Sequence, residues 1–287
     1  MSSLFDLGDE EIDRLIKVAN SAAEAAGEIV NKYYCRRLKV DEKNGDGPVT
    51  MADREAERAM VEIIQENFPS HAIYGEETGW HNSKEGNEKP EFVWVLDPID
   101  GTTSYIAGHG CISLLFGVLI GLVYRGKPFL GCIDQPVSGY RWMGVRGRMS
   151  TLNGKPTSTV ACEDLGLANA YLKSPYYSED AEFAYDKTVS KVKTVEYDGN
   201  CIAYGALASG FSDLVIDSGL DPFDFLAVIP VVEGAGGVIT DWQGRDLLWD
   251  PNPADPSSGI PDGGFKIVAA GDPIIHSQVI ALLADEC

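Results

Sequence analysis

The sequence lacks several features that would each have indicated a class of protein. Its apolar runs fall short of the roughly 20 residues that cross a bilayer. Its six cysteines contain no C-x-x-C pair, so neither a zinc site nor a disulfide scaffold is indicated, and we expect free thiols in a reducing compartment. The segment from Met1 to Asp13 is acidic and has no charged-then-apolar leader. We expect a cytoplasmic protein, or an organellar one whose transit peptide has been removed.

Basic residues are scarce in this chain. Its 287 residues include 23 Lys and Arg against 44 Asp and Glu, which gives a formal net charge of −21 at pH 7. This balance argues against nucleic acids and anionic membranes as partners, because both require basic patches. It also conflicts with a phosphate substrate, unless some carboxylates bind divalent cations that reverse the local charge.

The motifs of several other enzyme classes are missing. The four histidines stand apart from any G-x-S-x-G or Cys/His pairing; they are His71, His81, His109 and His276. No phosphate-binding P-loop is present. The glycine-rich run at 233–237 follows a predicted helix and precedes a strand, which is the reverse of a dinucleotide-binding fingerprint. A helix C-terminal turn explains that run better.

The pattern of apolar residues predicts a mixed α and β protein with a large core, since 44% of the residues are hydrophobic. Helical spacing predicts a long amphipathic helix from Ile12 to Tyr33 and a second from Thr50 to Pro69. Strands are expected in the first half at 73–74, 92–96, 111–123, 129–133 and 141–145, the last three as an antiparallel meander. Exposed loops are expected at 41–47, 78–90 and 251–264.

The second half of the chain alternates strands with helices, as α/β proteins do. Strands are predicted at 168–172, 213–217, 238–241 and 265–270, and helices at 179–190, 203–209, 222–233 and 273–284. We place a soft boundary at about 145–162. It separates an N-terminal α+β half, residues 1–150, with the main metal-binding motifs from a C-terminal α/β half, residues 151–287.

The segment Trp94–Thr103 carries the clearest chemical signal. A buried strand stops at an Asp-Pro step, where Pro98 biases Asp97 away from the helical conformation. Asp97 and Asp100 are therefore expected on a stiff turn, beside a Gly101 whose neighbouring N–H groups can approach a ligand closely. Carboxylates this close repel each other unless a cation lies between them, and oxygen ligands favour Mg²⁺ or Mn²⁺. A metal beside glycine-loop amides can hold a phosphate.

Four further acids fall at the ends of predicted elements and can be grouped with these two only by structural inference. They are Asp53, Glu76, Asp217 and Asp224. Each also has a simpler explanation: Thr50-x-x-Asp53 and Asp221-x-x-Asp224 match capping boxes, and Glu76 could be a solvated loop residue. Spacing alone leaves both interpretations open.

Separated motifs along the chain resemble those of the inositol monophosphatase superfamily, which comprises Mg²⁺-dependent, lithium-sensitive phosphatases. They lie at 48–53, 75–77, 94–102, 222–224 and 234–237. The resemblance covers nearly the whole chain and implies a layered αβαβα sandwich of the inositol monophosphatase and fructose-1,6-bisphosphatase type. It also implies a homodimer that is inhibited by Li⁺. The one departure in these motifs is Phe223, which stands where the family more often has Trp.

The resemblance implies a role for each residue of the site. The implied metal ligands, for two or three Mg²⁺ per subunit, are Glu76, Asp97, the Ile99 carbonyl, Asp100, Asp224 and, for a third and weaker ion, Asp53. Glu76 and Thr102 would orient the attacking water, with Asp53 assisting. Backbone N–H groups of the segment Gly101, Thr102 and Thr103 would bind the phosphate.

Three segments look most like histidinol-phosphate phosphatases within this superfamily; they are 130–136, 204–210 and 219–226. The implied substrate contacts are Asp217, Gly199 and Asn200, and an acid such as Asp217 can pair with a substrate ammonium. Asn200 departs from the Asp that these phosphatases usually carry. We therefore favour L-histidinol phosphate as the substrate, in histidine biosynthesis. Inositol 1-phosphate and nucleotide or sugar phosphates are the alternatives, and a non-catalytic divalent-metal binding protein is an alternative of another class.

Overall fold

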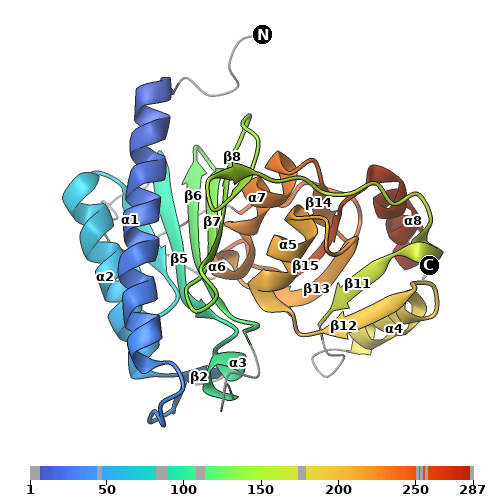
Figure 1. Ribbon diagram of the computed structural model, residues 1–287, viewed down its shortest axis with the longest axis horizontal. Coiled ribbons are helices and arrows are strands. Elements are labelled where there is room, and N and C mark those ends of the chain that lie inside the picture. Colours follow the sequence, from blue (N-terminus) through green and yellow to red (C-terminus); the bar gives the residue numbers. More distant parts are fainter. Residues whose placement is uncertain are drawn as a thin grey trace.

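The computed structural model in Figure 1 describes residues 7–43, 47–81, 90–107, 114–173, 179–249, 252, 255 and 258–284. Outside these ranges lie His109, the start of the predicted strand at 111–113, and parts of the predicted loops at 78–90 and 251–264. The four cysteines in the described ranges are free thiols, namely Cys35, Cys132, Cys162 and Cys201. Among the described helices, none combines the length and apolar character required to cross a membrane.

The larger sheet has eight strands in the order β10-β9-β8-β7-β6-β5-β3-β4. They are β3 (Ala72–Gly75), β4 (Gly79–His81), β5 (Phe92–Asp100), β6 (Gly117–Tyr124), β7 (Lys127–Gln135), β8 (Tyr140–Val145), β9 (Thr151–Leu152) and β10 (Lys155–Pro156). All neighbours are antiparallel except β3 and β5, which run parallel. The carboxyl ends of β3 and β5 therefore lie at the same edge of the sheet.

The smaller sheet has five strands in the order β12-β11-β13-β15-β14. They are β11 (Asn169–Leu172), β12 (Thr194–Tyr197), β13 (Leu214–Leu220), β14 (Val238–Asp241) and β15 (Phe265–Ala270). Strand β11 runs parallel to both β12 and β13, whereas β15 is antiparallel to β13 and β14. A separate hairpin pairs β1 (Asp41–Lys43) with β2 (Gly47–Val49).

The helices form three layers around the two sheets (Figure 1). Helices α1 (Asp9–Tyr33) and α2 (Met51–Asn67) pack on one face of the larger sheet. Between the sheets lie α5 (Asn200–Ala208), α6 (Pro222–Phe225) and α7 (Val228–Gly234). The far face of the smaller sheet is covered by α4 (Glu179–Val189) and α8 (Pro273–Ala284), while α3 (Thr102–Ala107) follows β5. The layers are thus α, β, α, β and α, as the resemblance implies.

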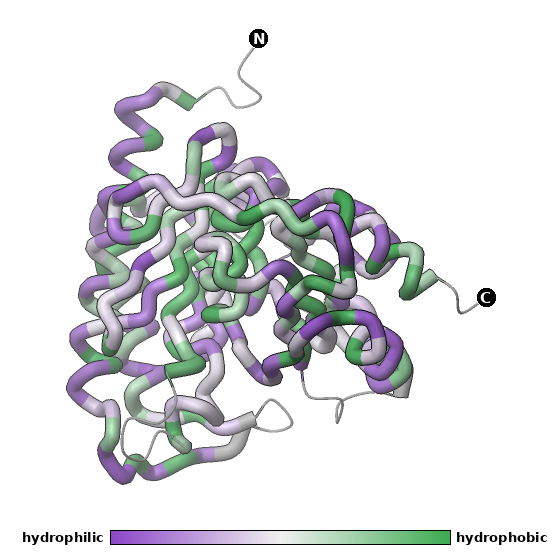
Figure 2. The backbone as a smooth tube through the Cα atoms, turned by 45° about the vertical axis from the view of Figure 1, so that its right-hand side comes forward, coloured by the Kyte–Doolittle hydropathy of each residue, from purple (hydrophilic) through white to green (hydrophobic). Residues whose placement is uncertain are grey.

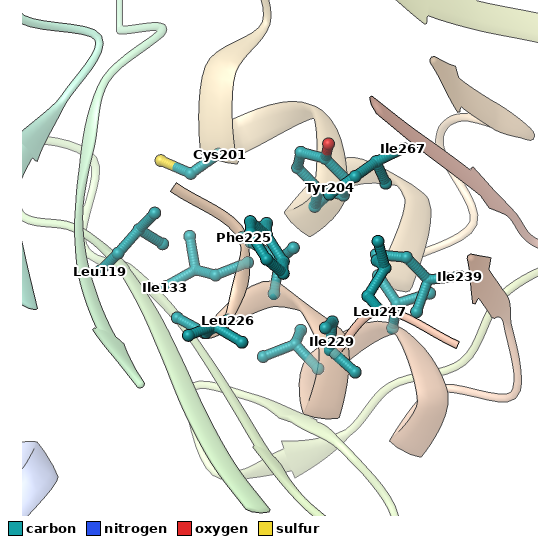
Figure 3. Close-up of a cluster of buried hydrophobic side chains, with 14 of the residues drawn as sticks. Leu119, Ile133, Cys201, Tyr204, Phe225, Leu226, Ile229, Ile239, Leu247 and Ile267 are labelled. Atoms are coloured by element: carbon teal, nitrogen blue, oxygen red, sulfur yellow. The ribbon is translucent and has the colours of Figure 1, made fainter. Parts of the chain in front are cut away.

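Burial of apolar faces explains this layering. Along α1, which follows the N-terminus in Figure 2, green and purple segments alternate, and the apolar face buries Leu15, Ala22 and Val30 against the sheet. Between the sheets, Leu119 and Ile133 meet Phe225 and other side chains from α5, α6 and α7 (Figure 3). Removal of this apolar surface from water is the main force that joins the two sheets.

A row of three glycines seats the junction of α6 and α7 on the larger sheet. Gly121, Gly131 and Gly144 are register partners across β6, β7 and β8. A Cβ atom at Gly131 would overlap the carbonyl oxygen of Ala227, and one at Gly144 would overlap Pro230. Because these positions have no side chain, the helix backbone lies directly on the strands, which places α6 at the sheet edge where β5 ends.

Several predicted elements differ from the structure. The predicted helix at 222–233 is two helices, because Pro230 has no N–H to donate to the Leu226 carbonyl. The predicted loop at 41–47 contains β1 and the first residue of β2, and the predicted loop at 78–90 contains β4. Each of these strands has three residues, which is too short for the alternation on which strand predictions depend. Strand β5 continues through the Asp-Pro step to Asp100. Helix α3 and strand β12 were not predicted.

Candidate functional site

Three carboxylates meet where β5 ends and α6 begins. Asp97, Asp100 and Asp224 each place one oxygen so that all three atoms lie within 4.8 Å of one another. Asp97 and Asp100 would face opposite sides of a regular strand, but a register irregularity between them lets both reach the same cluster. The Asp97 carboxylate also accepts a hydrogen bond of 3.0 Å from the Ile99 N–H, which stabilises this irregular part of β5.

The electrostatics of this acid cluster (Asp97, Asp100 and Asp224) are unfavourable for three ionised carboxylates. Burial, followed by the charges of the neighbouring acids, raises the pKa of Asp97 well above its usual value. Burial and the charge of Asp100 do the same for the pKa of Asp224. Burial raises the pKa of Asp100 to about 6, although hydrogen bonds from Cys201 act in the opposite direction. The cluster therefore requires protons or a cation.

Glu76 and Asp53 border the acid cluster. Glu76 follows β3, and its N–H donates to the Leu96 carbonyl at 3.1 Å, which ties it to β5. The Glu76 charge contributes to the raised pKa of Asp97, Asp224 and Asp53. Glu76 is not among the three acids of the close group, but it lies beside Asp97. The structure thus brings together acids from four separate segments of the chain.

Asp53 is both a helix-capping residue and a neighbour of the site. Its Oδ2 accepts hydrogen bonds from the Thr50 N–H at 2.9 Å and from the Thr50 hydroxyl at 2.6 Å, so the capping interpretation is correct. Its Oδ1 lies 3.4 Å from Oγ1 of Thr102, which in turn lies 3.0 Å from the Ile99 carbonyl. One hydroxyl therefore connects α2 with the turn that carries Asp97 and Asp100.

Gly101 lies in a position that admits no side chain. Its φ is +82°, in the left-handed region. A Cβ atom there would lie 2.7 Å from the Leu115 carbonyl oxygen and closer still to the amide of Asn200. Helix α3 begins at the next residue, so the N–H groups of Thr102 and Thr103 belong to a first helical turn, whose amides have no intrahelical acceptor.

A polar pocket opens beside the acid cluster. Asp100 and Asp224 line it, together with residues of β11, α5 and β13 and of the segments that follow β11 and β12. Asp217 on β13 accepts from the Ser218 N–H at 2.9 Å and from the Tyr204 hydroxyl at 3.4 Å. Its Oδ1 also lies 3.7 Å from Nζ of Lys173. The pocket thus contains a partly buried carboxylate that is already oriented.

The other two predicted substrate contacts, Gly199 and Asn200, also line this pocket. The Asn200 amide nitrogen, however, donates to the Leu115 carbonyl at 2.7 Å and lies 3.5 Å from the Ser104 hydroxyl. The adjacent Cys201 N–H donates to the Asp100 carboxylate. Asn200 thus holds the segment behind Gly101, and its contact with a substrate stays a prediction.

Two charged residues of the pocket were missed by the sequence reasoning. Lys173 and Asp198 both line the pocket, each one residue beyond the end of β11 or β12. Strand β11 is parallel to β12 and β13, so their carboxyl ends meet at one edge. For Lys173 the available signal was a charge directly after the predicted strand at 168–172, but the strand pairing had to be known to use it. Asp198 gave no such signal, because β12 was not predicted.

An aromatic cluster lies near the acid cluster in the chain. The rings of Tyr74, Trp80, Phe223 and Trp249 form it, with Tyr74 two residues before Glu76 and Phe223 next to Asp224. The Tyr74 ring centroid lies 5.0 Å from that of Trp80 and 6.2 Å from that of Phe223. Trp80 stacks on Trp249 at 6.0 Å. Apolar rings therefore join the β3 side of the site to the α6 side.

The donor set fits a hard divalent cation. Within the described part of the chain, the one close group of acids, histidines or cysteines consists of carboxylates alone. Oxygen ligands of this kind suit Mg²⁺ or Mn²⁺, whereas zinc sites usually recruit His or Cys. Cations between these carboxylates would also relieve the repulsion that raises their pKa values.

Comparison with known proteins gives consistent matches along the chain. A family model described as "Inositol monophosphatase family" matches residues 11–283. The bifunctional phosphatase IMPL2, chloroplastic, of Arabidopsis thaliana is 50% identical over 279 residues, which cover 97% of this chain and 77% of that protein. A histidinol-phosphatase of Chlorobaculum parvum is 34% identical over 238 residues, covering 82% of this chain and 88% of the relative.

Solved structures agree with these sequence matches. An inositol monophosphatase from Zymomonas mobilis superposes with a TM-score of 0.79 at 34% identity, covering 96% of this chain and 99% of that one. The matches confirm three predictions: the layered fold, the resemblance on which it rested, and the enzyme class of phosphoric monoester hydrolases.

Proposed function

The chain belongs to the inositol monophosphatase family, and from that premise we propose that it is a Mg²⁺-dependent phosphomonoesterase with L-histidinol phosphate as its preferred substrate. One observation carries the proposal: Asp100 and Asp224 belong both to the acid cluster and to the wall of the polar pocket. A phosphate held at the acid cluster would therefore place its alcohol in the pocket.

The metal site in this proposal uses the residues that the resemblance implies. Two or three Mg²⁺, for which Mn²⁺ can substitute, bind to Glu76, Asp97, the Ile99 carbonyl, Asp100, Asp224 and, more weakly, Asp53. When bound, these ions lower the pKa of a water molecule and neutralise the charge of the phosphate. They also explain how a chain with a net charge of −21 accepts an anionic substrate.

The side chains then position the reactants. Glu76 accepts a hydrogen bond from the attacking water, and Thr102, whose hydroxyl is fixed between Asp53 and the Ile99 carbonyl, orients it. The N–H groups from Gly101 to Thr103 bind phosphate oxygens. Water attacks the phosphorus in line with the bond to the alcohol, and that P–O bond breaks as the new one forms. The departing alkoxide takes up one proton, which the attacking water loses, and leaves as the alcohol.

The charges in the pocket favour a cationic alcohol. Besides Asp100 and Asp224, the charged residues that line it are Lys173, Asp198 and Asp217. One positive and two negative charges leave −1, which a substrate ammonium would balance. Inositol and sugar phosphates carry no such group. The histidinol-phosphatase relative supports the same substrate, and the chloroplastic name of the Arabidopsis relative supports the organellar alternative for the location.

A phosphate-release assay tests the proposal. With Mg²⁺ present, we expect kcat/KM for L-histidinol phosphate to exceed that for inositol 1-phosphate, a nucleoside monophosphate and a sugar phosphate by about tenfold or more, since a charge-assisted contact contributes about 1.5–3 kcal/mol. Asp217→Asn should remove this preference while leaving inositol phosphate hydrolysis nearly unchanged. Excess Li⁺ should inhibit, and light scattering should show the homodimer.

Other outcomes would favour the alternatives. Equal or faster hydrolysis of inositol 1-phosphate would replace the proposed substrate with a polyol phosphate. Mg²⁺ binding in calorimetry without phosphate release from any ester would indicate a non-catalytic metal-binding protein.

A further inference from the structure

A buried carboxylate on α2 contacts the segment that carries Glu76. Glu57 lies one helical turn after Asp53, and its side chain is 0% exposed. Its Oε2 accepts a hydrogen bond of 2.8 Å from the Glu77 N–H. Its Oε1 accepts one of 2.8 Å from the Thr78 N–H and another from the Thr78 hydroxyl. Three donors from one turn therefore converge on a single carboxylate.

The glycine before Glu76 is part of the same arrangement. A Cβ atom at Gly75 would overlap the Glu57 carboxylate, so the absence of a side chain there lets Glu57 lie directly against the turn. The turn is held on its other side by the hydrogen bond from the Glu76 N–H to the Leu96 carbonyl. The backbone on both sides of Glu76 is thus fixed by named contacts.

We infer that Glu57 is a positioning residue for Glu76: its carboxylate clamps the turn from Gly75 to Thr78 and so keeps the Glu76 side chain beside Asp97. The inference rests on the proposed function, because it takes Glu76 to be a metal ligand. Helix α2 would then support the site through two side chains on one face. Asp53 contacts Thr102, and Glu57 holds the turn that carries Glu76. A neutral amide cannot satisfy both backbone donors, because the Glu77 and Thr78 N–H groups bind different oxygens of the carboxylate and an amide has only one oxygen.

The test is Glu57→Gln, which keeps the shape but turns an NH₂ group toward one of the backbone donors. Because loss of a partner that orients a metal ligand typically costs 10–100-fold, we expect kcat to fall by about that factor with KM nearly unchanged. The Mg²⁺ concentration for half-maximal activity should rise. Glu62→Gln, at an exposed position on the same helix, removes the same charge and should change neither quantity.

Hydrogen exchange of the metal-free protein gives a second readout that does not depend on activity. In Glu57→Gln the Glu77 and Thr78 amides should exchange at least about tenfold faster, since their acceptor is lost, while the Val95 amide in the core of β5 should be unchanged. A general loss of stability would instead accelerate both regions.

A milder pair of variants covers the case in which Glu57→Gln fails to fold. Thr78 is exposed; its hydroxyl also contacts Nε2 of His81. Thr78→Val should raise the Mg²⁺ requirement by a few fold, and Thr78→Ser, which keeps the hydroxyl, should restore it.

Two results would overturn the inference. The first is a folded Glu57→Gln variant whose kcat and Mg²⁺ midpoint equal those of the wild type. The second is a loss of activity in Glu57→Gln that is fully explained by the fraction of this variant that is unfolded, as measured by urea titration. Failure of the proposed function is distinguishable, because the wild type would then release no phosphate. Mg²⁺ calorimetry and amide exchange would still decide whether Glu57 positions Glu76.

Discussion

Asp53 and Asp224 occupy the same local position in two helices but leave different groups available to a ligand. Each is the third residue of its helix and the last residue of a capping box, at the start of α2 and α6 respectively. Both Asp53 oxygens have partners within the protein, two donors from Thr50 and the Thr102 hydroxyl. Asp224 accepts from the Asp221 N–H at 2.7 Å and also places an oxygen in the acid cluster.

The comparison shows that capping and metal binding are not competing explanations. A carboxylate has about four acceptor sites, and a capping box uses one or two of them. Asp53 and Asp224 differ in how many of their remaining acceptor sites are occupied by other donors of the protein. Helix starts suit both roles, because the macrodipole stabilises negative charge there.

The largest expected effect compares Asp224→Asn with Asp53→Asn. Asp224→Asn should lower phosphate release about a thousandfold, because the charge stabilisation from a bound metal is worth several kcal/mol and each 1.4 kcal/mol is tenfold. Asp53→Asn should cost about 10–100-fold and raise the Mg²⁺ requirement. Circular dichroism should show both variants folded. Equal losses at saturating Mg²⁺ would remove the distinction between the two acids.

The next effect concerns the packing of the α6–α7 junction on the larger sheet. Helix α6 depends on the glycine row, so Gly131→Ala should lower the free energy of unfolding by about 3 kcal/mol, at the upper end of overpacking costs. Gly121→Ala should cost less, because its Cβ would lie 3.2 Å from the Ala227 nitrogen instead of overlapping an atom. Urea titration gives both values, and the reverse order would contradict the account of this seat.

Acid should lower the free energy of unfolding through a buried histidine near the end of α2. Near the end of α2, His71 is 7% exposed, stacks between Phe68 and Phe92, and accepts a hydrogen bond of 3.1 Å from Trp94. Burial lowers its pKa to about 4. The unfolded chain therefore takes up a proton below about pH 6.5 while the folded protein does not, and stability falls until about pH 4.

The size of this pH effect can be measured in urea. Between pH 7 and pH 5, His71 should remove about 2 kcal/mol from the free energy of unfolding, as linkage requires for such a shift. His71→Phe should be less stable at pH 7, because the Trp94 N–H loses its acceptor, but should lack this part of the pH dependence. An unchanged slope would show that other groups set the acid response.

The smallest expected effect is at the cap of α2. Thr50 accepts from the Ala52 N–H at 3.1 Å and donates to Asp53. Thr50→Ala should lower the free energy of unfolding by about 1 kcal/mol, the typical value for a lost N-cap. Thr50→Ser keeps the hydroxyl and should lose less. A large loss of activity in Thr50→Ala would mean that the cap also sets the geometry of Asp53 at the site.

The sequence predicted what local patterns determine. Helix α1 has a long 3.6-residue repeat, and the strand before Asp97 is a continuous apolar run, so both were found. The resemblance to a known family led to the grouping of the acids, and the structure brings Asp97, Asp100 and Asp224 of that group together. Pro230 could have predicted that the helix at 222–233 is divided into two, but the prediction did not use it. The division of the chain at residue 150 stays a prediction.

The remaining residues could not be found from local patterns, because their roles depend on tertiary pairing. Lys173 and Asp198 reach the pocket only because β11, β12 and β13 are parallel neighbours. Glu57 fits the helical pattern of α2 as an ordinary charged residue, and only its burial under the turn after β3 reveals its role. Strand β12, Thr-Val-Glu-Tyr, alternates polar and apolar residues over only four positions, which is too short a run to identify from sequence alone.

The aromatic cluster makes the site visible to spectroscopy. Trp80 and Trp249 stack on each other, and Tyr74 contacts both of them as well as Phe223. Tyr74 lies two residues before Glu76, and Phe223 lies next to Asp224. If cations bind between these acids as proposed, the environment of the rings should change, and native fluorescence should then report a Mg²⁺ titration without any substrate.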